Sequence, residues 1–202
     1  HTDASPDGHV SARDRSSALA AEGIRFAIAT DHNAVTTLPE KPTLATAKGV
    51  EVTTWAPEIG HFNVFPVRAA PEYRARTARE LFADLHRDPD VVIIANHPRL
   101  EDHIAYFGLA GLDAEGRVHE GFSLDFDALE VWNGYDLARP ARVDRVFAEW
   151  LALVARGHSI AAIGASDSHR ATGQWVGYPR TMVRLGEGEG IDGVNVARAV
   201  RA

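Results

Sequence analysis

Apolar and polar positions alternate along the chain in two patterns, one typical of buried strands and one of amphipathic helices. Short apolar runs bounded by polar or turn residues predict strands. We expect six of them, at 24–30, 49–54, 61–67, 91–95, 129–132 and 159–164. The run from Val91 to Ala95 contains no polar residue, which is typical of a strand buried on both faces.

Helices are expected where apolar residues recur every three to four positions. In the segment 77–87, Leu81, Phe82 and Leu85 share one face. Ser11 can cap a helix that Gly23 ends. We predict four helices, at 11–22, 77–87, 141–156 and 192–202. The third has the longest apolar stripe, made of Val143, Val146, Phe147, Trp150, Leu151 and Val154.

The order of these elements predicts the fold class. Strands that alternate with amphipathic helices are typical of an α/β domain with a parallel sheet or barrel. The segment 99–126 is long, polar and contains glycine, so we expect irregular structure there, lying over the site. No repeat or Ser/Gly-rich linker divides the chain, and residues 1–202 are treated as one domain.

Composition excludes some classes of protein. The 202 residues have a net charge of −7 and include no cysteine, which excludes disulfides and thiolate metal sites. An acidic chain without a basic cluster is not typical of proteins that neutralise nucleic-acid phosphates, so no nucleic-acid partner is expected. No segment approaches the roughly 20 apolar residues that span a bilayer, so we expect a soluble domain without a membrane partner.

The ends of the chain leave the compartment open. No signal peptide is visible at the start, but the first residue is His1 and not Met. We expect a domain trimmed at its N-terminus, and the helix at 192–202 leaves trimming at the C-terminus open as well. The sequence does not assign a compartment.

Candidate metal ligands follow the predicted strands. The strand at 24–30 leads into His32, the strand at 91–95 into His97, and the strand at 159–164 into Asp167 and His169. Glu51 lies within the strand at 49–54. Because the carboxyl ends of parallel strands converge, these side chains can meet although they are far apart in sequence. Imidazole and carboxylate without cysteine suit Zn, Mn, Fe or Ni, in a hydrolytic multinuclear site more than in a structural zinc site.

Structural roles account for each of these residues taken singly. A lone histidine after a strand is usually a core or surface residue, Asp31 and Asp167 can cap turns or helices, and His97 before Pro98 can belong to a turn. The recurrence of the pattern on several strands favours the metal site. The remaining histidines are expected to be structural or solvent-facing, with His103 and His119 placed to overhang the site: His9, His86, His103, His119 and His158.

The same segments resemble the motifs of the PHP (polymerase and histidinol phosphatase) superfamily, in that family's order along almost the whole chain. The residues HTDASPDG at 1–8 are similar to its first motif, ATDHN at 29–33 to its second, and GVEVTT at 49–54 to its Glu-bearing strand. NHPR at 96–99 resembles the third motif and SDSH at 166–169 the last. GHFNVF at 60–65 is similar to the CehA/McbA-like branch.

This resemblance implies a distorted (β/α)7 barrel that binds two or three divalent metal ions (Zn, Mn or Fe). The ligands it implies, with Glu51 as the natural bridging carboxylate, are His1, Asp7, His32, Glu51, His97, Asp167 and His169. The family's first motif begins His-x-His, and His1 matches its second histidine. The first histidine and most of the first barrel strand then precede residue 1, so we expect a barrel that lacks its first strand within these residues.

Three further residues are candidates for catalytic roles. His61 shares a strand face with Asn63, and the short connection suggests pairing with the strand that bears Glu51. His61 could then act as a general acid or bind substrate, or it could be a polar residue of a half-exposed hairpin. Arg99 and Arg170 directly follow motifs, and a guanidinium suits a phosphate or carboxylate, although a surface ion pair accounts for either equally well.

Other polar and aromatic residues near the motifs have weaker assignments. Glu130 and Asn133 flank a strand end and could orient ligating imidazoles. Trp55, Trp132 and Trp175 lie in or near loops, where they could line a pocket for an aromatic group, although tryptophan more often simply packs.

The resemblance implies hydrolysis of a small-molecule substrate, and a phosphate ester is favoured. A metal-activated hydroxide at a di- or trinuclear centre would attack phosphorus, while the metals and an arginine stabilise the charge. The same centre would serve a carbamate, ester or amide hydrolase, and the sequence does not separate the two. A non-catalytic PHP module with a structural or interaction role is a further alternative. An exonuclease is the least expected, because the chain has no basic tract.

Overall fold

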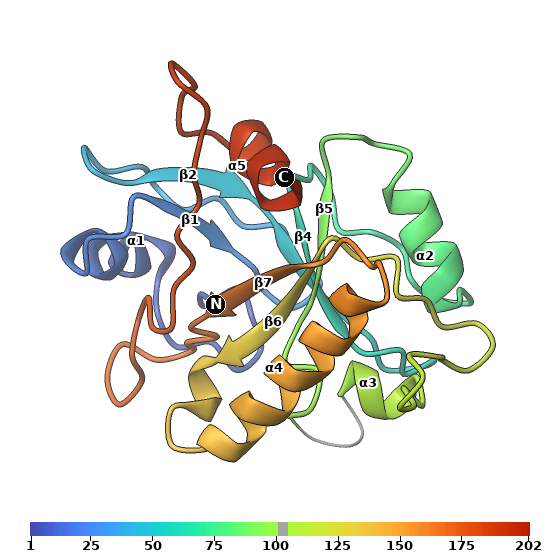
Figure 1. Ribbon diagram of the computed structural model, residues 1–202. Helices are drawn as coiled ribbons and strands as arrows, with labels where there is room; N and C mark the ends of the chain where they lie inside the picture. The colour runs from blue at the N-terminus through green and yellow to red at the C-terminus, as the bar shows by residue number, and fades with distance from the viewer. Residues whose placement is uncertain (101–104) are drawn as a thin grey trace.

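The computed structural model describes residues 1–100 and 105–202 and has mixed α/β structure, which confirms the predicted class (Figure 1). Its strands are β1 (Phe26–Ala29), β2 (Ala45–Lys48), β3 (Val50–Thr53), β4 (His61–Phe65), β5 (Val92–Ala95), β6 (Ala128–Asn133) and β7 (Ala161–Ala165). Its helices are α1 (Ala12–Ala21), α2 (Ala78–Leu85), α3 (Tyr106–Leu109), α4 (Pro140–Ala155) and α5 (Gly193–Arg201), with a 3-10 turn η1 (Gly134–Asp136). All six predicted strands and all four predicted helices are present.

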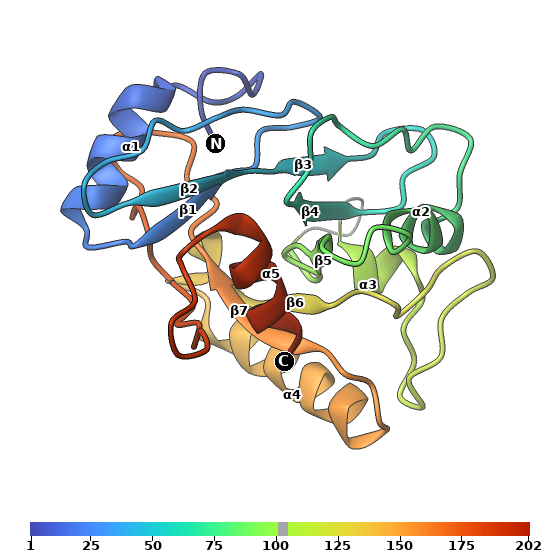
Figure 2. The same ribbon diagram turned by 90° about the horizontal axis from the view of Figure 1, so that it is seen from above.

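The strands form two sheets that share one extended segment. Five strands pair in the order β3-β4-β5-β6-β7, and β1 pairs with β2 in parallel. Only Gly49 separates β2 from β3, so the segment 45–53 belongs to both sheets (Figure 2). A Cβ on Gly49 would lie 2.3 Å from the side chain of Ile28, so glycine lets β1 approach this segment closely.

One strand breaks the parallel arrangement that the sequence predicts. β4 is antiparallel to both β3 and β5, whereas β5, β6 and β7 are parallel to one another. As a result β3, β5, β6 and β7 run in the same direction and end at one edge. Within the described residues the two sheets do not close into a barrel.

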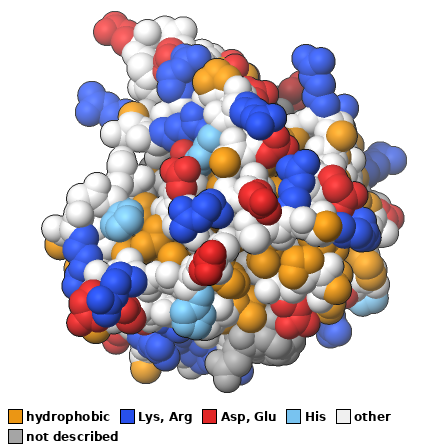
Figure 3. All heavy atoms as spheres, turned by 90° about the vertical axis from the view of Figure 1, so that its right-hand side faces the viewer, with side chains coloured by type: hydrophobic (Ala, Val, Ile, Leu, Met, Phe, Trp, Pro, Cys, Tyr) orange, Lys and Arg blue, Asp and Glu red, His pale blue; other side chains and the backbone are white. Residues whose placement is uncertain are grey.

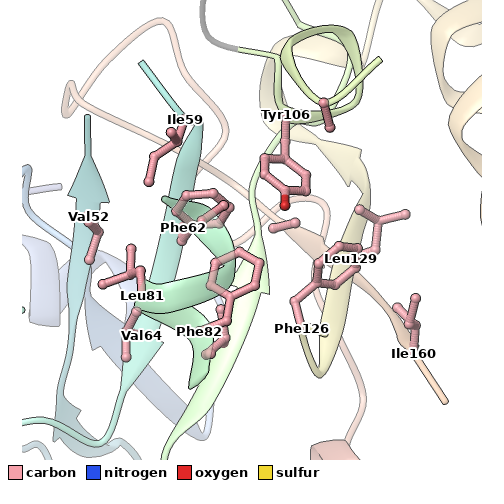
Figure 4. Close-up of a cluster of buried hydrophobic side chains, with 14 of the residues drawn as sticks. Val52, Ile59, Phe62, Val64, Leu81, Phe82, Tyr106, Phe126, Leu129 and Ile160 are labelled. Carbon is pink, nitrogen blue, oxygen red and sulfur yellow. The ribbon is translucent and has the colours of Figure 1, made fainter. Parts of the chain in front are cut away.

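A buried aromatic cluster fixes the helices on one face of the larger sheet (Figure 4). Phe62 of β4 meets Phe82 of α2 edge-to-face at 4.9 Å between ring centroids, and Tyr106 of α3 at 5.1 Å. α2 begins with a capping box between Thr77 and Glu80, which satisfies free N–H groups of its first turn. This core holds the strand that carries Glu51 rigidly in place.

The apolar stripe predicted for α4 is only half correct. Val146 and Leu153 are buried, and Trp150 packs against the core. Phe147, Leu151 and Val154 are instead 40–47% exposed. Val146, Trp150 and Leu153, spaced i, i+4, i+7, form the buried row of the helix, which lies against β6, and the adjoining apolar row is exposed.

The described residues include no helix long and apolar enough to cross a bilayer. On the face shown in Figure 3, basic and acidic side chains are interspersed and no basic tract gathers.

Candidate metal centre

All seven predicted ligand residues gather at the strand ends, although they come from five separate segments. The ligand atoms of three groups lie within 4.8 Å of one another: His1, His32 and His169; Glu51, His61 and His97; and His1, Glu51 and Asp167. Buried His, Glu and Asp groups of this kind can hold a metal ion. The groups share His1 and Glu51, so they form one connected cluster.

Glu51 lies between the two halves of the cluster. Its Oε2 is 3.1 Å from His1 Nε2, and its Oε1 is 2.8 Å from His61 Nδ1. His97 Nε2 approaches the same Oε1 at 3.6 Å. Each carboxylate oxygen therefore faces a different set of imidazoles.

Hydrogen bonds outside the cluster fix the tautomer of His1. The Ser5 hydroxyl donates to Asp31 Oδ1 at 2.9 Å, so its oxygen accepts from His1 Nδ1 at 2.9 Å. The proton of the neutral ring is then on Nδ1. In that neutral form the lone pair of Nε2 faces Glu51 and Asp167, 3.0 Å from the latter, whereas a protonated Nε2 donates to the same carboxylates.

His169 is oriented in the same sense. Its Nδ1 lies 3.0 Å from the backbone oxygen of Asp167, which can only accept, so Nδ1 carries the proton. Nε2 is buried without a hydrogen-bond partner and points toward Asp7 Oδ2 at 3.4 Å. Asp7 Oδ1 lies equally close to His32 Nε2, so the exposed carboxylate of Asp7 spans two imidazoles at the mouth of the cluster.

Several buried polar atoms of the cluster lack hydrogen bonds. They are Glu51 Oε1, both ring nitrogens of His61, His97 Nδ1 and His169 Nε2. His61 Nδ1 and Glu51 Oε1 are 2.8 Å apart and yet are not aligned as a hydrogen bond. Buried polar atoms are normally satisfied, so converging unpaired nitrogens and oxygens fit ligands aimed at cations. The donor set thus fits divalent ions on chemistry and on burial.

The carboxylates make the cluster attract positive charge. Burial lowers the pKa of His1, but hydrogen bonds to Asp167 and Glu51 outweigh it and raise this pKa to about 10. Burial likewise lowers the pKa of His97, but its hydrogen bond to Glu51 outweighs burial and raises this pKa to about 9. Burial would raise the pKa of Glu51, yet its contacts with His1, His61 and His97 hold it well below the ordinary range. Protons and metal ions compete for such sites.

The backbone is strained at the cluster. Positive φ angles occur at Asn33 (53°), His97 (27°) and Asp167 (46°), a region that non-glycine residues rarely adopt. The Asn33 side chain pairs with Thr53 through both Nδ2 (2.7 Å) and Oδ1 (3.0 Å), as a strand backbone would. Strain of this kind clusters at functional sites, where the surroundings hold it in place.

The three predicted catalytic residues lie in different surroundings. His61 is buried within a candidate metal group, so its position resembles that of a ligand more than that of a general acid. The guanidinium of Arg99 makes a two-pronged ion pair with Glu149 of α4 at 2.9 and 3.0 Å, the structural alternative considered for it. Arg170 is exposed beside His169, and its backbone N–H donates to Gln174.

Glu130 and Asn133 lie where the sequence suggested, behind the ligands. Glu130 Oε2 accepts the backbone N–H of His97 at 2.8 Å and the Asn133 amide at 3.0 Å. The same amide nitrogen donates to Asp167 Oδ2 at 3.1 Å. Burial raises the pKa of Glu130 to about 7. These contacts connect β6 to ligands on the two strands beside it.

The histidines set aside as structural are mostly outside the cluster. His86 pairs with Asp127, and His9 and His119 are exposed. His103 lies outside the described residues. Trp55 and Trp175 are 65% and 70% exposed, so neither is a packing residue of the core.

Sequence reasoning missed the residues that orient the ligands. Arg15 of α1 is buried and donates to the backbone oxygens of His1 and Ser168, each at 2.9 Å. Ser5 lies within the first motif, at 1–8, but no role was predicted for it. Tyr135 and Gln174 approach His169 from two loops. A long cationic side chain within the helix predicted at 11–22 was the only signal in the sequence that could have pointed to Arg15.

A cleft of about 550 Å³ runs from the cluster between β1 and β7. Its inner end is polar and includes His1, Glu51 and Asp167. The rest of its lining is mainly apolar and includes Phe26, Ile28 and Ile163, with side chains of α5. Within the described residues β1 and β7 each pair with a single strand, so the cleft separates two strands at sheet edges.

Comparisons with known proteins do not assign a family. No protein-family model matches the chain, and no curated protein matches it. Among solved structures, the crystal structure of PsfC from Pseudomonas syringae PB-5123 is similar, with a TM-score of 0.49 and 17% sequence identity. The similarity covers 77% of this chain and spans 66% of the length of that one. A likeness at this level identifies neither a family nor an activity.

Proposed function

We propose that this chain is a metal-dependent hydrolase of the PHP superfamily, near its CehA/McbA-like branch, and that it acts on a small phosphate ester. The observation that supports this most is the position of Glu51, whose two carboxylate oxygens face separate groups of imidazoles at 3.1 and 2.8 Å. A buried cluster with this many convergent nitrogen and oxygen ligands exceeds what one structural ion needs.

Under this proposal two or three divalent ions are held by the residues of the cluster. Zn, Mn and Fe all suit a site of imidazoles and carboxylates. His1, Asp7, His32 and His169 would serve the outer part of the site, and His97 and His61 the inner part. Glu51 and Asp167 would connect the two. His61 is proposed here as a ligand on the basis of its burial beside Glu51.

The ions would supply Lewis-acid catalysis and a low-pKa water, and the chain's own residues would do the rest. Asn133 and Glu130 hold His97 and Asp167 in fixed orientations, so little reorganisation is needed during the reaction. Arg170 is exposed beside His169, where it could bind the phosphate group. Arg99 is the weaker candidate for this role, because Glu149 already neutralises its charge.

A carbamate, ester or amide hydrolase is the second candidate. The same ions and metal-activated water would serve attack on a carbonyl carbon as well as on phosphorus. A non-catalytic PHP module is the third candidate, and the unpaired buried atoms of the cluster argue against a metal-free form of it, because they would have no partner without a bound cation.

We also propose that the two sheets are parts of a distorted (β/α)7 barrel. The cleft between β1 and β7 supports this, because one further strand would fit between two strands that each pair on one side. The α-amino nitrogen of His1 donates to the Ser168 oxygen at 3.1 Å, so a strand leading into His1 would run alongside β7. An experimental structure of the full gene product whose cleft holds no strand would contradict the barrel.

Metal content and hydrolysis together test the proposed function. Purified protein, loaded with Zn or Mn and desalted, is expected to retain two or three ions per chain by elemental analysis. Glu51→Gln keeps the size of the side chain but removes its charge, and it should lose at least one ion and nearly all hydrolysis of 4-nitrophenyl phosphate. Glu58→Gln, at an exposed position, is the matched control and should behave as wild type.

Each outcome separates the candidates. Hydrolysis of phosphate esters supports the first candidate, and hydrolysis confined to 4-nitrophenyl N-methylcarbamate or acetate supports the second. Tightly bound metal without hydrolysis of any of these esters favours the non-catalytic module. Failure to retain metal at all would overturn the hydrolase proposal.

A further inference from the structure

Tyr135 lies beside the metal cluster and has no role in the function proposed so far. It belongs to η1, directly after the end of β6, and its hydroxyl oxygen is 3.4 Å from His169 Nδ1. Gly134 allows this position: a Cβ there would meet the backbone oxygen of Ser166 at 2.0 Å. The turn is therefore pressed against the loop that carries Asp167 and His169.

Further contacts fix the turn on its other side. The backbone N–H of Tyr135 donates to Asn133 Oδ1 at 2.9 Å, and the next residue, Asp136, pairs with Arg142 of α4 at 2.7 Å. The residue as a whole is 46% exposed. These contacts hold the backbone of Tyr135 in place while the residue is about half exposed, so its side chain is placed to meet a substrate that enters from solvent.

The hydrogen bonds around the hydroxyl leave its proton free. His169 Nδ1 already carries a proton, because it donates to the Asp167 carbonyl, so it can receive none from Tyr135. Gln174 Oε1 accepts the backbone N–H groups of His169 (2.6 Å) and Arg170 (2.8 Å), which fixes the orientation of its amide. Gln174 Nε2 then faces the phenol oxygen at 3.4 Å as a donor. Both neighbours offer protons, so the O–H of Tyr135 has no acceptor among the contacts the structure describes.

We propose that Tyr135 is a catalytic hydrogen-bond donor, which stabilises the leaving oxygen of the ester as it departs. This inference rests on the proposed hydrolase function and adds a residue to it. The phenol lies on the Nδ1 side of His169, whereas Nε2 faces Asp7 at the cluster, so under this proposal the leaving group would project from the cluster toward the hydroxyl.

Hydrolysis at this site needs no reactant other than the ester and water. Hydrolysis breaks the bond between phosphorus and the leaving oxygen and forms a bond between phosphorus and a water oxygen. The leaving oxygen gains electron density and takes up the hydrogen bond, then the proton, of the Tyr135 hydroxyl. The phenolate recovers a proton from solvent water. A donor of this kind contributes most when the leaving group is a poor one.

Tyr135→Phe removes the hydroxyl and little else, and Tyr178→Phe is the matched control. Tyr178 is also about half exposed, but it lies in the segment after β7, where Arg180 stacks on its ring. We would measure kcat and KM for phenyl phosphate and for 4-nitrophenyl phosphate, with metal content determined on the same samples. Phenolate is the poorer leaving group, because its conjugate acid is less acidic than 4-nitrophenol.

The expected result for Tyr135→Phe is a loss of kcat of roughly 100-fold on phenyl phosphate and a much smaller loss on the nitrophenyl ester, with KM and metal content unchanged. Equal losses on both esters, or none, would overturn the role of Tyr135 and leave the hydrolase proposal intact. Wild-type protein that binds metal but hydrolyses neither ester overturns the proposed phosphoesterase, and the role of Tyr135 with it.

Discussion

The hydroxyl of Ser5 shows how one small residue controls the cluster. It donates to Asp31 and accepts from both His1 Nδ1 and the backbone N–H of His32 at 3.0 Å. Asp31 is held in turn by Thr2, so the chain of bonds ends in a buried carboxylate. Two candidate ligands therefore depend on a single oxygen atom that is not itself a ligand.

Replacing Ser5 by alanine should weaken metal binding without unfolding the protein. The His1 ring would lose the acceptor that keeps its proton on Nδ1, and loss of such a partner typically reduces metal affinity roughly 10–100-fold. Competition with a chromogenic chelator would measure the affinity for Zn. Ser17→Ala, on the exposed side of α1, is the control and should leave the affinity unchanged. An unchanged affinity in Ser5→Ala would show that His1 is oriented by other contacts.

The difference between ligands and supporting residues explains what the sequence could predict at this scale. His32, His97 and Asp167 follow apolar runs directly, so strand ends that converge were enough to bring them together. Nothing in a single sequence indicates which hydroxyl or guanidinium lies behind a ligand, because that depends on the packing of segments far apart in the chain. Arg15 and Tyr135 are the clearest cases.

At the scale of elements, Asp127 joins four of them at the opposite end of the sheet from the cluster. It lies just before β6, and its carboxylate accepts from the backbone of Ile93 in β5 at 2.7 Å and from Arg201 of α5 at 2.9 Å. His86, at the C-terminal end of α2, donates to it from Nε2 at 3.1 Å. The hydrogen bond to Asp127 raises the pKa of His86 above 6.5, although burial opposes the rise.

This pair predicts a pH-dependent contribution to stability. A histidine whose pKa is raised in the folded state stabilises it fully below the unfolded pKa of about 6.5, and that stabilisation is lost as the pH rises through the folded pKa. His86→Gln should therefore lower the free energy of unfolding by about 1 kcal/mol near pH 5.5 and by less near pH 9. Urea unfolding of both proteins in EDTA would measure the difference.

Taking the difference between the two proteins cancels the titration of the metal ligands, which both share. The carboxylate of Asp125, 3.5 Å from His86 Nδ1, acts in the same direction as Asp127, whereas Arg201 opposes both. His9→Gln, at an exposed position, is the matched control. A difference for His86→Gln that stays constant between the two pH values would mean that its hydrogen bond to Asp127 does not depend on charge.

The sequence predicted the positions of helices and strands along the chain better than it predicted which residues pack against other elements. Continuous apolar runs marked β5 and β7, a capping serine and a terminal glycine marked α1, and an apolar face marked α2. β2 was missed because Ala45 to Lys48 has little apolar content of its own and becomes a strand through pairing with β1. The exposed row on α4 was misjudged for a related reason: periodicity shows that a helix has an apolar side, but the sheet decides which residues it covers.

At the scale of the whole molecule, the cluster joins the first residues of the chain to the last strand of the larger sheet. His1 contacts Asp167 and Ser168, and Arg15 of α1 reinforces the same junction. This junction lies next to the cleft that separates β1 from β7. Because His32 follows β1 whereas Glu51 and Asp167 belong to the larger sheet, ions bound by these residues and His1 would link the two sheets.

Bound metal should accordingly stabilise the entire fold. An ion that binds only the folded state contributes about 2.7 kcal/mol when its concentration is about 100 times its Kd. For a chain of this length that corresponds to a rise in Tm of roughly 5–11 °C. Thermal unfolding of wild type, with EDTA and with Zn or Mn in excess, would measure the shift. Glu51→Gln should show a much smaller shift between the same two conditions, whereas Glu58→Gln should keep the full one. If wild type gains no stability from metal while retaining ions by elemental analysis, the ions bind the unfolded chain equally well, and the cluster does not hold the two sheets together.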